Sequence, residues 1–163
     1  MRDAVRERLG VHVNSLHAFA HSEALGGATR DYFEAVARLT TLSNELRLLI
    51  RLAVATANQC RYCTAHQRHQ LAGLGVSEAK LASIWQPDSV ALTVRERVAI
   101  RFAQAITLDA GGIPEAVYAD FIRQFTPQER VEVAIVATSM GMLNKLNDGL
   151  RVPLESEFEP LVT

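Results

Sequence analysis

The apolar residues of this chain recur at intervals of three and four positions, which is the period of an amphipathic helix. Leu16, Phe19, Ala20 and Ala24 follow this spacing near the start, and Gly26 with Gly27 predicts the end of a first helix. No stretch alternates apolar and polar residues between hairpin turns, as a half-buried β-strand would. The pattern therefore predicts an all-α protein of seven or eight helices.

Start and stop residues separate the predicted helices. Thr93 with Glu96 and Thr126 with Glu129 have the spacing of a capping box, and Pro127 is a residue favoured at the first helical position. The expected helices cover residues 13–25, 31–39, 43–57, 59–74 and 77–85, followed by one from 93, one from 114 to 125 and one from 126 to 149.

Two of these segments, residues 46–57 and 131–143, are apolar on nearly every face. A helix of this kind is normally buried on all sides, so we expect both segments at the centre of the fold. Because they are too apolar for the surface of a monomer, we also expect a homo-oligomer that covers part of them.

Composition and charge narrow the class of protein. The chain has 163 residues, 48% apolar and 21% charged, which fits one globular domain over residues 1–163. A formal net charge of −1 and the lack of any Lys/Arg run argue against a nucleic-acid partner or an acidic membrane surface. The first ten residues are charged, and the most apolar run contains Arg47 and Arg51, so we expect no signal peptide and no membrane span. These features predict a cytoplasmic protein.

The two cysteines of the chain stand three positions apart, at Cys60 and Cys63. In a reducing cytosol, such a pair is more often catalytic or metal-binding than structural. Asn58 is expected to cap the helix that follows, which places both thiols where unpaired amides lower a thiol pKa. Protonated His66, one turn beyond Cys63, would lower it further. A thiolate with a second thiol beside it can attack an oxidant and then form an intramolecular disulfide.

Two other uses of the pair stay open. Cys60, Cys63, His66 and His69 are all good zinc ligands, but a continuous helix spreads residues three apart around and along its axis. Such a ladder cannot surround one ion, and a two-cysteine half-site completed by a second subunit is the form of zinc site that stays open. Two inert buried cysteines are the other alternative. Redox use is favoured, with no metal and no cofactor.

Three features carry a family resemblance: C-x-Y-C-x-x-H at residues 60–66, GLGVS at residues 73–77, and Asn144, Asn147 and Asp148 before the last helix ends. Together they resemble the AhpD-like, carboxymuconolactone decarboxylase superfamily over roughly residues 39–154. The resemblance implies an AhpD-like helical bundle, homo-oligomers from dimers to hexamers, and thiol-dependent alkylhydroperoxidase activity of the peroxiredoxin type.

The resemblance also implies a role for each cysteine. Cys63 attacks a small hydroperoxide, Cys60 resolves the product, and a dithiol or lipoyl-type reductant restores the pair. Three alternatives stay open: a dithiol–disulfide oxidoreductase without peroxidase activity, a carboxymuconolactone decarboxylase-like enzyme, and a binding protein.

The proton relay of the superfamily is not present at its usual positions. Its relay glutamate falls on Leu48 and its relay histidine on Gln67. The nearest titratable substitutes are His66, one position earlier, and Glu45, one turn before Leu48. We therefore take Cys63, Cys60, His66 and Glu45 as the candidate catalytic residues.

Overall fold

The computed structural model describes residues 13–86 and 89–161, and every regular element among them is a helix. The elements are α2 (Asn14–Phe19), α3 (Glu23–Ala37), α4 (Asn44–Ala57), α5 (Arg61–Gly73), α6 (Glu78–Ala82), the 3₁₀ helix η1 (Ser83–Trp85), α7 (Val94–Leu108), α8 (Glu115–Gln124), α9 (Pro127–Gly149) and the 3₁₀ helix η2 (Ser156–Leu161). The predicted all-α class is confirmed.

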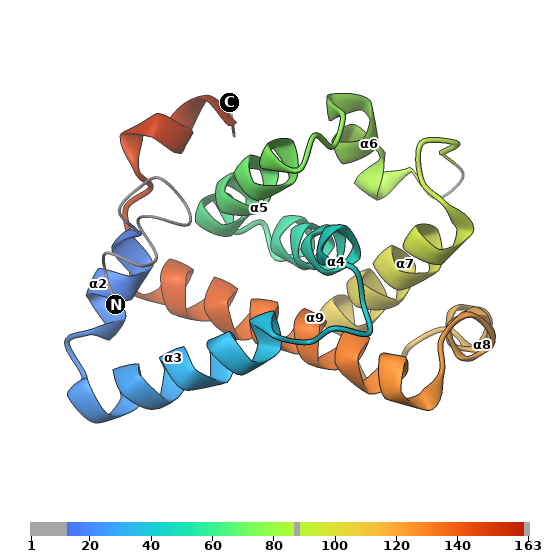
Figure 1. Ribbon diagram of the computed structural model, residues 1–163, viewed down its shortest axis with the longest axis horizontal. Helices are drawn as coiled ribbons and strands as arrows, with labels where there is room; N and C mark the ends of the chain where they lie inside the picture. The colour runs from blue at the N-terminus through green and yellow to red at the C-terminus, as the bar shows by residue number, and fades with distance from the viewer. Residues whose placement is uncertain (1–12, 87–88, 162–163) are drawn as a thin grey trace.

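Helix α4 forms the centre of the fold. It contacts α5, α7 and α9, and Figure 1 shows it in the middle of the molecule with these helices around it. Leu49, Ile50 and Val54 of α4 are fully buried, and they join Val133 and Val136 of α9 in one hydrophobic core. The apolar pattern of residues 46–57 thus predicts the position of α4 correctly.

The capping residues place the helix starts. Ser43 Oγ accepts a hydrogen bond from the amide of Leu46 at 3.2 Å, at the start of α4. At the start of α9, Thr126 Oγ1 accepts from the amide of Glu129 at 3.3 Å, and the Glu129 carboxylate accepts from the amide of Thr126 at 2.9 Å. These short-range bonds use amides that a helix leaves unpaired, so they can be predicted from the local sequence.

The prediction that Gly26 and Gly27 end the first helix is wrong. Helix α3 begins at Glu23, after a break at Ala20–Ser22, and continues through both glycines. A side-chain Cβ on Gly26 would lie 2.7 Å from the carbonyl oxygen of Phe19. The glycine therefore permits the close approach of α2 and α3 instead of stopping a helix.

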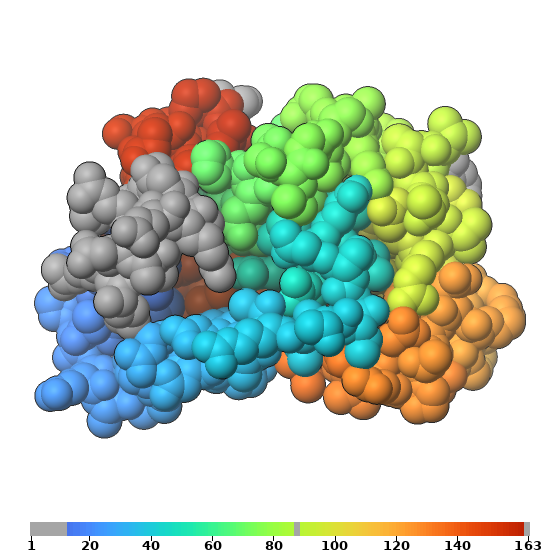
Figure 2. All heavy atoms as spheres, viewed as in Figure 1, coloured from blue at the N-terminus to red at the C-terminus, as the bar shows by residue number. Residues whose placement is uncertain are grey.

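The segment after α9 turns back and packs on α5 (Figure 1). The space-filling view shows this tail (red) beside α5 (green), while α3 (blue to cyan) runs along the lower edge (Figure 2). Phe158 of η2 is buried, with 2% of its surface exposed. No helix in the part of the chain that the structure describes is both long and apolar enough to span a membrane.

Candidate active site

The link between α4 and α5 determines where the two thiols lie. Asn58 is the C-cap residue of α4, Gln59 adopts the left-handed backbone region with a φ of 57°, and Cys60 is the N-cap residue of α5. Cys60 Sγ accepts a hydrogen bond from the amide of Cys63 at 3.4 Å. The prediction that Asn58 caps α5 is wrong, because Asn58 closes α4 and the turn at Gln59 separates the helices. Both sulfurs nevertheless lie at the N-terminus of α5, where amides and the helix dipole stabilise a thiolate.

Both cysteines are free thiols and are shielded from solvent. The exposed fraction is 0% for Cys60 and 2% for Cys63. Burial by itself raises the pKa of a thiol, because the thiolate loses its hydration. The polar groups packed around the pair therefore decide which sulfur ionises.

The surroundings of the two sulfurs differ. A hydrogen bond from the Cys60 thiol lowers the pKa of Cys63, and the side-chain amides of Asn147 and Asn144 add to this effect against the cost of burial. Asn147 Nδ2 lies 3.3 Å from Cys63 Sγ. The bond to Cys63, burial and the carboxyl group of Asp148 raise the pKa of Cys60. Cys63 is therefore the sulfur that ionises first.

The amides that face Cys63 belong to the last turns of α9. Asn144 and Asn147 are three residues apart, share one face of the helix, and are buried. Asn58 Nδ2 donates to Asn144 Oδ1 at 2.8 Å, which fixes the orientation of the Asn144 amide. Asn144 Nδ2, Asn147 Oδ1 and Gln67 Oε1 are buried and make no hydrogen bond among the described residues. Because buried polar atoms normally have a partner, these three are suited to bind a small polar molecule near Cys63.

His66 lies on α5, one turn beyond Cys63, and is buried. Its Nε2 is 2.8 Å from Glu155 Oε2. Its ring stacks on Tyr62 at 4.6 Å between centroids and meets the edge of Phe158 at 4.5 Å. No hydrogen bond joins His66 to either sulfur, all three residues being described. His66 is thus a titratable group close to the dithiol whose orientation is set by a carboxylate.

Glu155 connects three parts of the chain. It accepts hydrogen bonds from His66 of α5, from the Tyr62 hydroxyl at 2.8 Å and from the Asn14 amide of α2 at 2.6 Å. Burial alone would raise the pKa of Glu155, but the bonds from His66, Asn14 and Tyr62 outweigh it and lower the pKa. Glu155 is a site residue that could not be predicted from the sequence, because it follows Pro153 in an irregular segment without helical periodicity and no local signal marks it.

Glu45 lies far from the dithiol. It is in the first turn of α4. The other end of this helix lies about 18 Å away along the axis and leads to Cys60. Its carboxylate pairs with Lys80 at 2.6 Å, and Lys80 also pairs with Glu96 at 2.8 Å. Glu45 therefore takes part in an ion-pair cluster between α4, α6 and α7, while Glu155 is the carboxylate that meets His66.

The other residues considered from the sequence do not form a second catalytic or metal site. His66 faces Glu155, and the ring of His69 lies 4.8 Å from that of Phe158. Leu48 and Gln67, which stand where the superfamily has its relay residues, are buried and carry no titratable group. No three His, Cys, Asp or Glu side chains within residues 13–86 and 89–161 are placed to hold one metal ion.

Replacing Cys60 by alanine is expected to raise the pKa of Cys63, because the variant lacks the thiol that donates to the Cys63 sulfur. The pH dependence of iodoacetamide alkylation measures this pKa. A Cys60→Ser variant is the matched control, since its hydroxyl can still donate and should give a smaller rise. An unchanged midpoint in Cys60→Ala would contradict the proposed hydrogen bond.

Comparison with known proteins places this geometry in a family. The model of the Carboxymuconolactone decarboxylase family matches residues 23–105, from α3 into α7. No curated protein sequence matches the chain significantly.

Several solved structures share the fold. The debrominase Bmp8 in complex with 2,3,4-tribromopyrrole has a TM-score of 0.88 and 19% identity, over 98% of this chain and 86% of that one. A peroxidase-related protein from Silicibacter sp. TM1040 has a TM-score of 0.86 and 21% identity, over 96% and 84%. An alkylhydroperoxidase AhpD core protein from Ralstonia eutropha JMP134 has a TM-score of 0.84 and 20% identity, over 96% and 84%. The resemblance inferred from the sequence is thus confirmed: the chain belongs to the carboxymuconolactone decarboxylase family.

Proposed function

We propose that this protein is a thiol-dependent hydroperoxide reductase in which Cys63 attacks the peroxide and Cys60 resolves the product. The asymmetry of the dithiol carries the proposal. The pKa of Cys63 is lowered by the Cys60 thiol and by the Asn147 and Asn144 amides, while that of Cys60 is raised. One sulfur is thereby prepared as a thiolate nucleophile, and the other stays protonated beside it. Similarity to proteins named peroxidase-related agrees with this chemistry.

The reaction proceeds in two steps at sulfur. The Cys63 thiolate attacks the terminal peroxide oxygen, the O–O bond breaks, and the alkoxide takes a proton and leaves as an alcohol. Cys63 is then a sulfenic acid. The Cys60 sulfur attacks Cys63 Sγ, a disulfide forms, and the sulfenic oxygen leaves as water with the proton from Cys60. An external dithiol reduces the disulfide by exchange, so each cycle converts one hydroperoxide to alcohol and water.

His66 supplies the proton for the departing alkoxide in this proposal. It is the titratable side chain one helical turn from Cys63, and an imidazole can donate a proton near neutral pH. Glu155 is a positioning residue, because its carboxylate holds Nε2 of His66 at 2.8 Å. Glu45 has no part in the step, since it pairs with Lys80 at the other end of α4.

Burial of both sulfurs favours a small substrate over a protein disulfide. A protein disulfide would have to reach sulfurs with exposed fractions of 0% and 2%. A small hydroperoxide needs much less access, and the unpaired amide atoms of Asn144, Asn147 and Gln67 can form hydrogen bonds with it. We therefore place peroxide reduction ahead of dithiol–disulfide exchange with proteins.

Reductive debromination is the second candidate. The fold is similar to that of the debrominase Bmp8 over 98% of the chain. The same thiolate could take a bromine atom from an aromatic ring, which receives a proton, and the second thiol would then expel bromide as the disulfide forms. The dithiol supplies both electrons, so this reaction consumes the same reductant as peroxide reduction.

We also propose a cytoplasmic homo-oligomer. The apolar residues of α4 are buried within one chain, so they do not require a second copy to cover them. On α9, however, Val131 is 58% exposed and Met142 is 41% exposed. Apolar side chains on the outside of a long helix favour contact with a second copy.

Peroxide consumption with a panel of dithiol donors tests the proposed activity. We expect cumene hydroperoxide to be reduced in the presence of dihydrolipoamide or dithiothreitol, and the double variant Cys60→Ser/Cys63→Ser to be inactive. Parallel assays contain 2,3,4-tribromopyrrole or a small disulfide in place of the peroxide. Turnover of either compound without any peroxide consumption would overturn the proposal.

A further inference from the structure

Four buried side-chain atoms make no hydrogen bond within the part of the chain that the structure describes, and three of them belong to residues close to the dithiol. These three are Gln67 Oε1 on α5, and Asn144 Nδ2 and Asn147 Oδ1 on α9. Each of the three residues is at most 3% exposed, so bulk water does not solvate these atoms. Because buried polar atoms normally have a partner, their concentration here indicates a site for a polar ligand.

The two asparagines approach the Cys63 sulfur from α9. Asn147 is already engaged with the sulfur, since its Nδ2 lies 3.3 Å from Cys63 Sγ. Asn144 Oδ1 accepts from Asn58 Nδ2 at 2.8 Å, which leaves the nitrogen of the Asn144 amide free to donate. The Asn144 amide is also one of the groups that, after the Cys60 thiol, lower the pKa of Cys63. Asn144 therefore supplies a free donor beside this sulfur.

Gln67 supplies a free acceptor from α5. It follows Cys63 by four positions, so the two side chains are neighbours on one face of the helix. Long side chains on a helix lean toward its N-terminus and cover the preceding turn, which here carries Cys63. Gln67 also stands where the superfamily has its relay histidine. Its amide carbonyl can accept a hydrogen bond at that position but cannot take up the proton.

A free donor and a free acceptor beside one sulfur define the chemistry of the ligand. An O–H group satisfies both, because its oxygen accepts from the Asn144 amide and its hydrogen is donated to the Gln67 carbonyl. A carboxylate satisfies only the donor and brings its negative charge to the Gln67 carbonyl oxygen. The site therefore favours a neutral hydroxyl or hydroperoxyl group over an anion.

We propose that Asn144 and Gln67 bind the terminal O–H of a hydroperoxide, with the Asn144 amide donating to the oxygen and the Gln67 carbonyl accepting the hydrogen. When the Cys63 thiolate attacks this oxygen, the S–O bond forms, the O–O bond breaks, and the alkoxide takes a proton from His66 and leaves as an alcohol. The transferred oxygen keeps its hydrogen and becomes the sulfenic acid, so the same two hydrogen bonds serve substrate and intermediate. This inference rests on the proposed function for the reaction, but the binding of the O–H can be tested without turnover.

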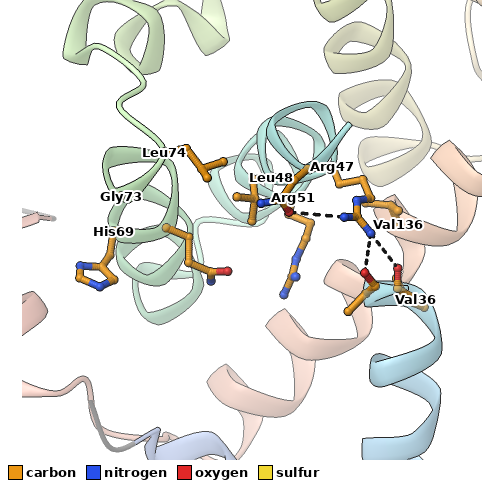
Figure 3. A pocket seen from close by; sticks show the side chains of 11 residues that line it. Val36, Arg47, Leu48, Arg51, His69, Gly73, Leu74 and Val136 are labelled. Atoms are coloured by element: carbon orange, nitrogen blue, oxygen red, sulfur yellow. Dashed lines mark hydrogen bonds between the residues drawn. The ribbon is translucent and has the colours of Figure 1, made fainter. Parts of the chain in front are cut away.

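Different residues line the cavity of about 360 Å³ between α4 and α5. Figure 3 shows this cavity with Leu48 on α4 and Leu74 on α5. Its described lining includes Gln70 of α5, but neither cysteine and none of the three residues with unpaired amide atoms. Gln70 Nε2 donates to the carbonyl oxygen of His66 at 3.3 Å. Gln70 is therefore a second glutamine on the same helix that lies outside the proposed site, and it provides a matched control.

The binding test uses two unreactive isomers that copy the shape of tert-butyl hydroperoxide. Neopentyl alcohol keeps the terminal O–H, while methyl tert-butyl ether has a methyl group in its place. We expect the alcohol to protect Cys63 of the wild-type protein from iodoacetamide at a concentration roughly 10-fold or more below that of the ether, because only the alcohol can donate to a carbonyl. Gln67→Leu should reduce this preference by roughly 5-fold or more, and Gln70→Leu should keep it.

Two outcomes of the binding test would overturn the proposal. Equal protection by the two isomers in the wild type would show that the terminal O–H is not recognised, whether or not the variants fold. Loss of the preference in Gln70→Leu, with the preference kept in Gln67→Leu, would place the ligand in the cavity instead.

The kinetic test separates recognition of the O–H from the reactivity of the thiolate. In a Cys60→Ser background, the rate constants of Cys63 with tert-butyl hydroperoxide and with iodoacetamide are measured in the same buffer. Both reactions need the thiolate, but only the peroxide presents an O–H. We expect the ratio of the peroxide rate to the iodoacetamide rate to fall by roughly 5- to 50-fold in Gln67→Leu and to stay unchanged in Gln70→Leu.

The two proposals fail in different ways. If the ratio is unchanged in Gln67→Leu, the O–H site is wrong and the peroxidase proposal stands. If the wild type consumes no peroxide while neopentyl alcohol still protects Cys63 better than the ether, the peroxidase proposal is wrong and the O–H site stands.

Discussion

The Cys63→Ser variant is expected to consume no peroxide, whereas Cys60→Ser is expected to react once and then stop. Cys63 has the lowered pKa and so supplies the thiolate, and serine cannot replace it as a nucleophile toward an O–O bond. Without Cys60, the sulfenic acid on Cys63 has no neighbouring thiol to resolve it. Rapid mixing with one equivalent of peroxide, followed by steady-state assay, measures the single event and the lost turnover.

Trapping of the sulfenic acid decides the order of the two sulfurs. A dimedone-type probe should label Cys63 in the Cys60→Ser variant, and mass spectrometry identifies the labelled residue. Unfolding curves of both variants are the control for a folding defect, since both positions are buried. Label on Cys60 in Cys63→Ser, with none on Cys63 in the other variant, would reverse the assignment.

Replacing Glu155 by alanine is expected to destabilise the protein by about 3–5 kcal/mol and to reduce turnover by up to roughly 100-fold. The side chain is 5% exposed and accepts hydrogen bonds from His66, Tyr62 and the Asn14 amide, so its loss leaves two buried donors and one partly buried donor without a partner. His66 would also lose the contact that orients its ring. Urea unfolding at neutral pH measures the loss of stability.

The acid dependence of stability provides a second readout for Glu155. Its folded-state pKa is lowered from 4.5, so the stabilisation is fully present above about pH 4.5 and is lost as the pH falls through the folded-state pKa. Glu155→Ala should remove this contribution to the acid unfolding curve.

Glu159→Gln is the control, because Glu159 also lies on the C-terminal tail but is half-exposed and pairs with Arg61. Equal stability of the two variants at neutral pH would show that the buried carboxylate is not needed.

The parts of the fold that could be predicted from the sequence are those set by neighbours in the chain. The capping boxes at Thr93 and Thr126 predict two helix starts correctly, because cap and helix lie within four residues. The apolar residues of α4 predict its burial, because they all lie within one continuous helix. Gly26 failed as a stop signal, since its role is set by the carbonyl of Phe19 in another helix.

In the candidate site, too, the local features could be predicted from the sequence and the long-range contacts could not. The sequence identifies the dithiol and places His66 one turn away, because all three residues share one short segment. The partner of His66 lies 89 residues further along, and only the return of the tail onto α5 brings Glu155 there. Asn147 could be noted from the family pattern, but its hydrogen bond to Cys63 depends on how α9 packs on α5.

The N-cap position of Cys60 has a consequence for the reduction potential of the pair. In the dithiol, Cys60 Sγ accepts the Cys63 amide and Cys63 Sγ accepts the Asn147 amide. Both bonds are strongest to a thiol or thiolate, and formation of the disulfide weakens them, so they stabilise the reduced form. If each contributes about 1 kcal/mol, the potential rises by roughly 40 mV, since 30 mV corresponds to about 1.4 kcal/mol for two electrons. The disulfide left after each turnover is therefore more oxidising than an uncapped pair, and a small dithiol reduces it more readily.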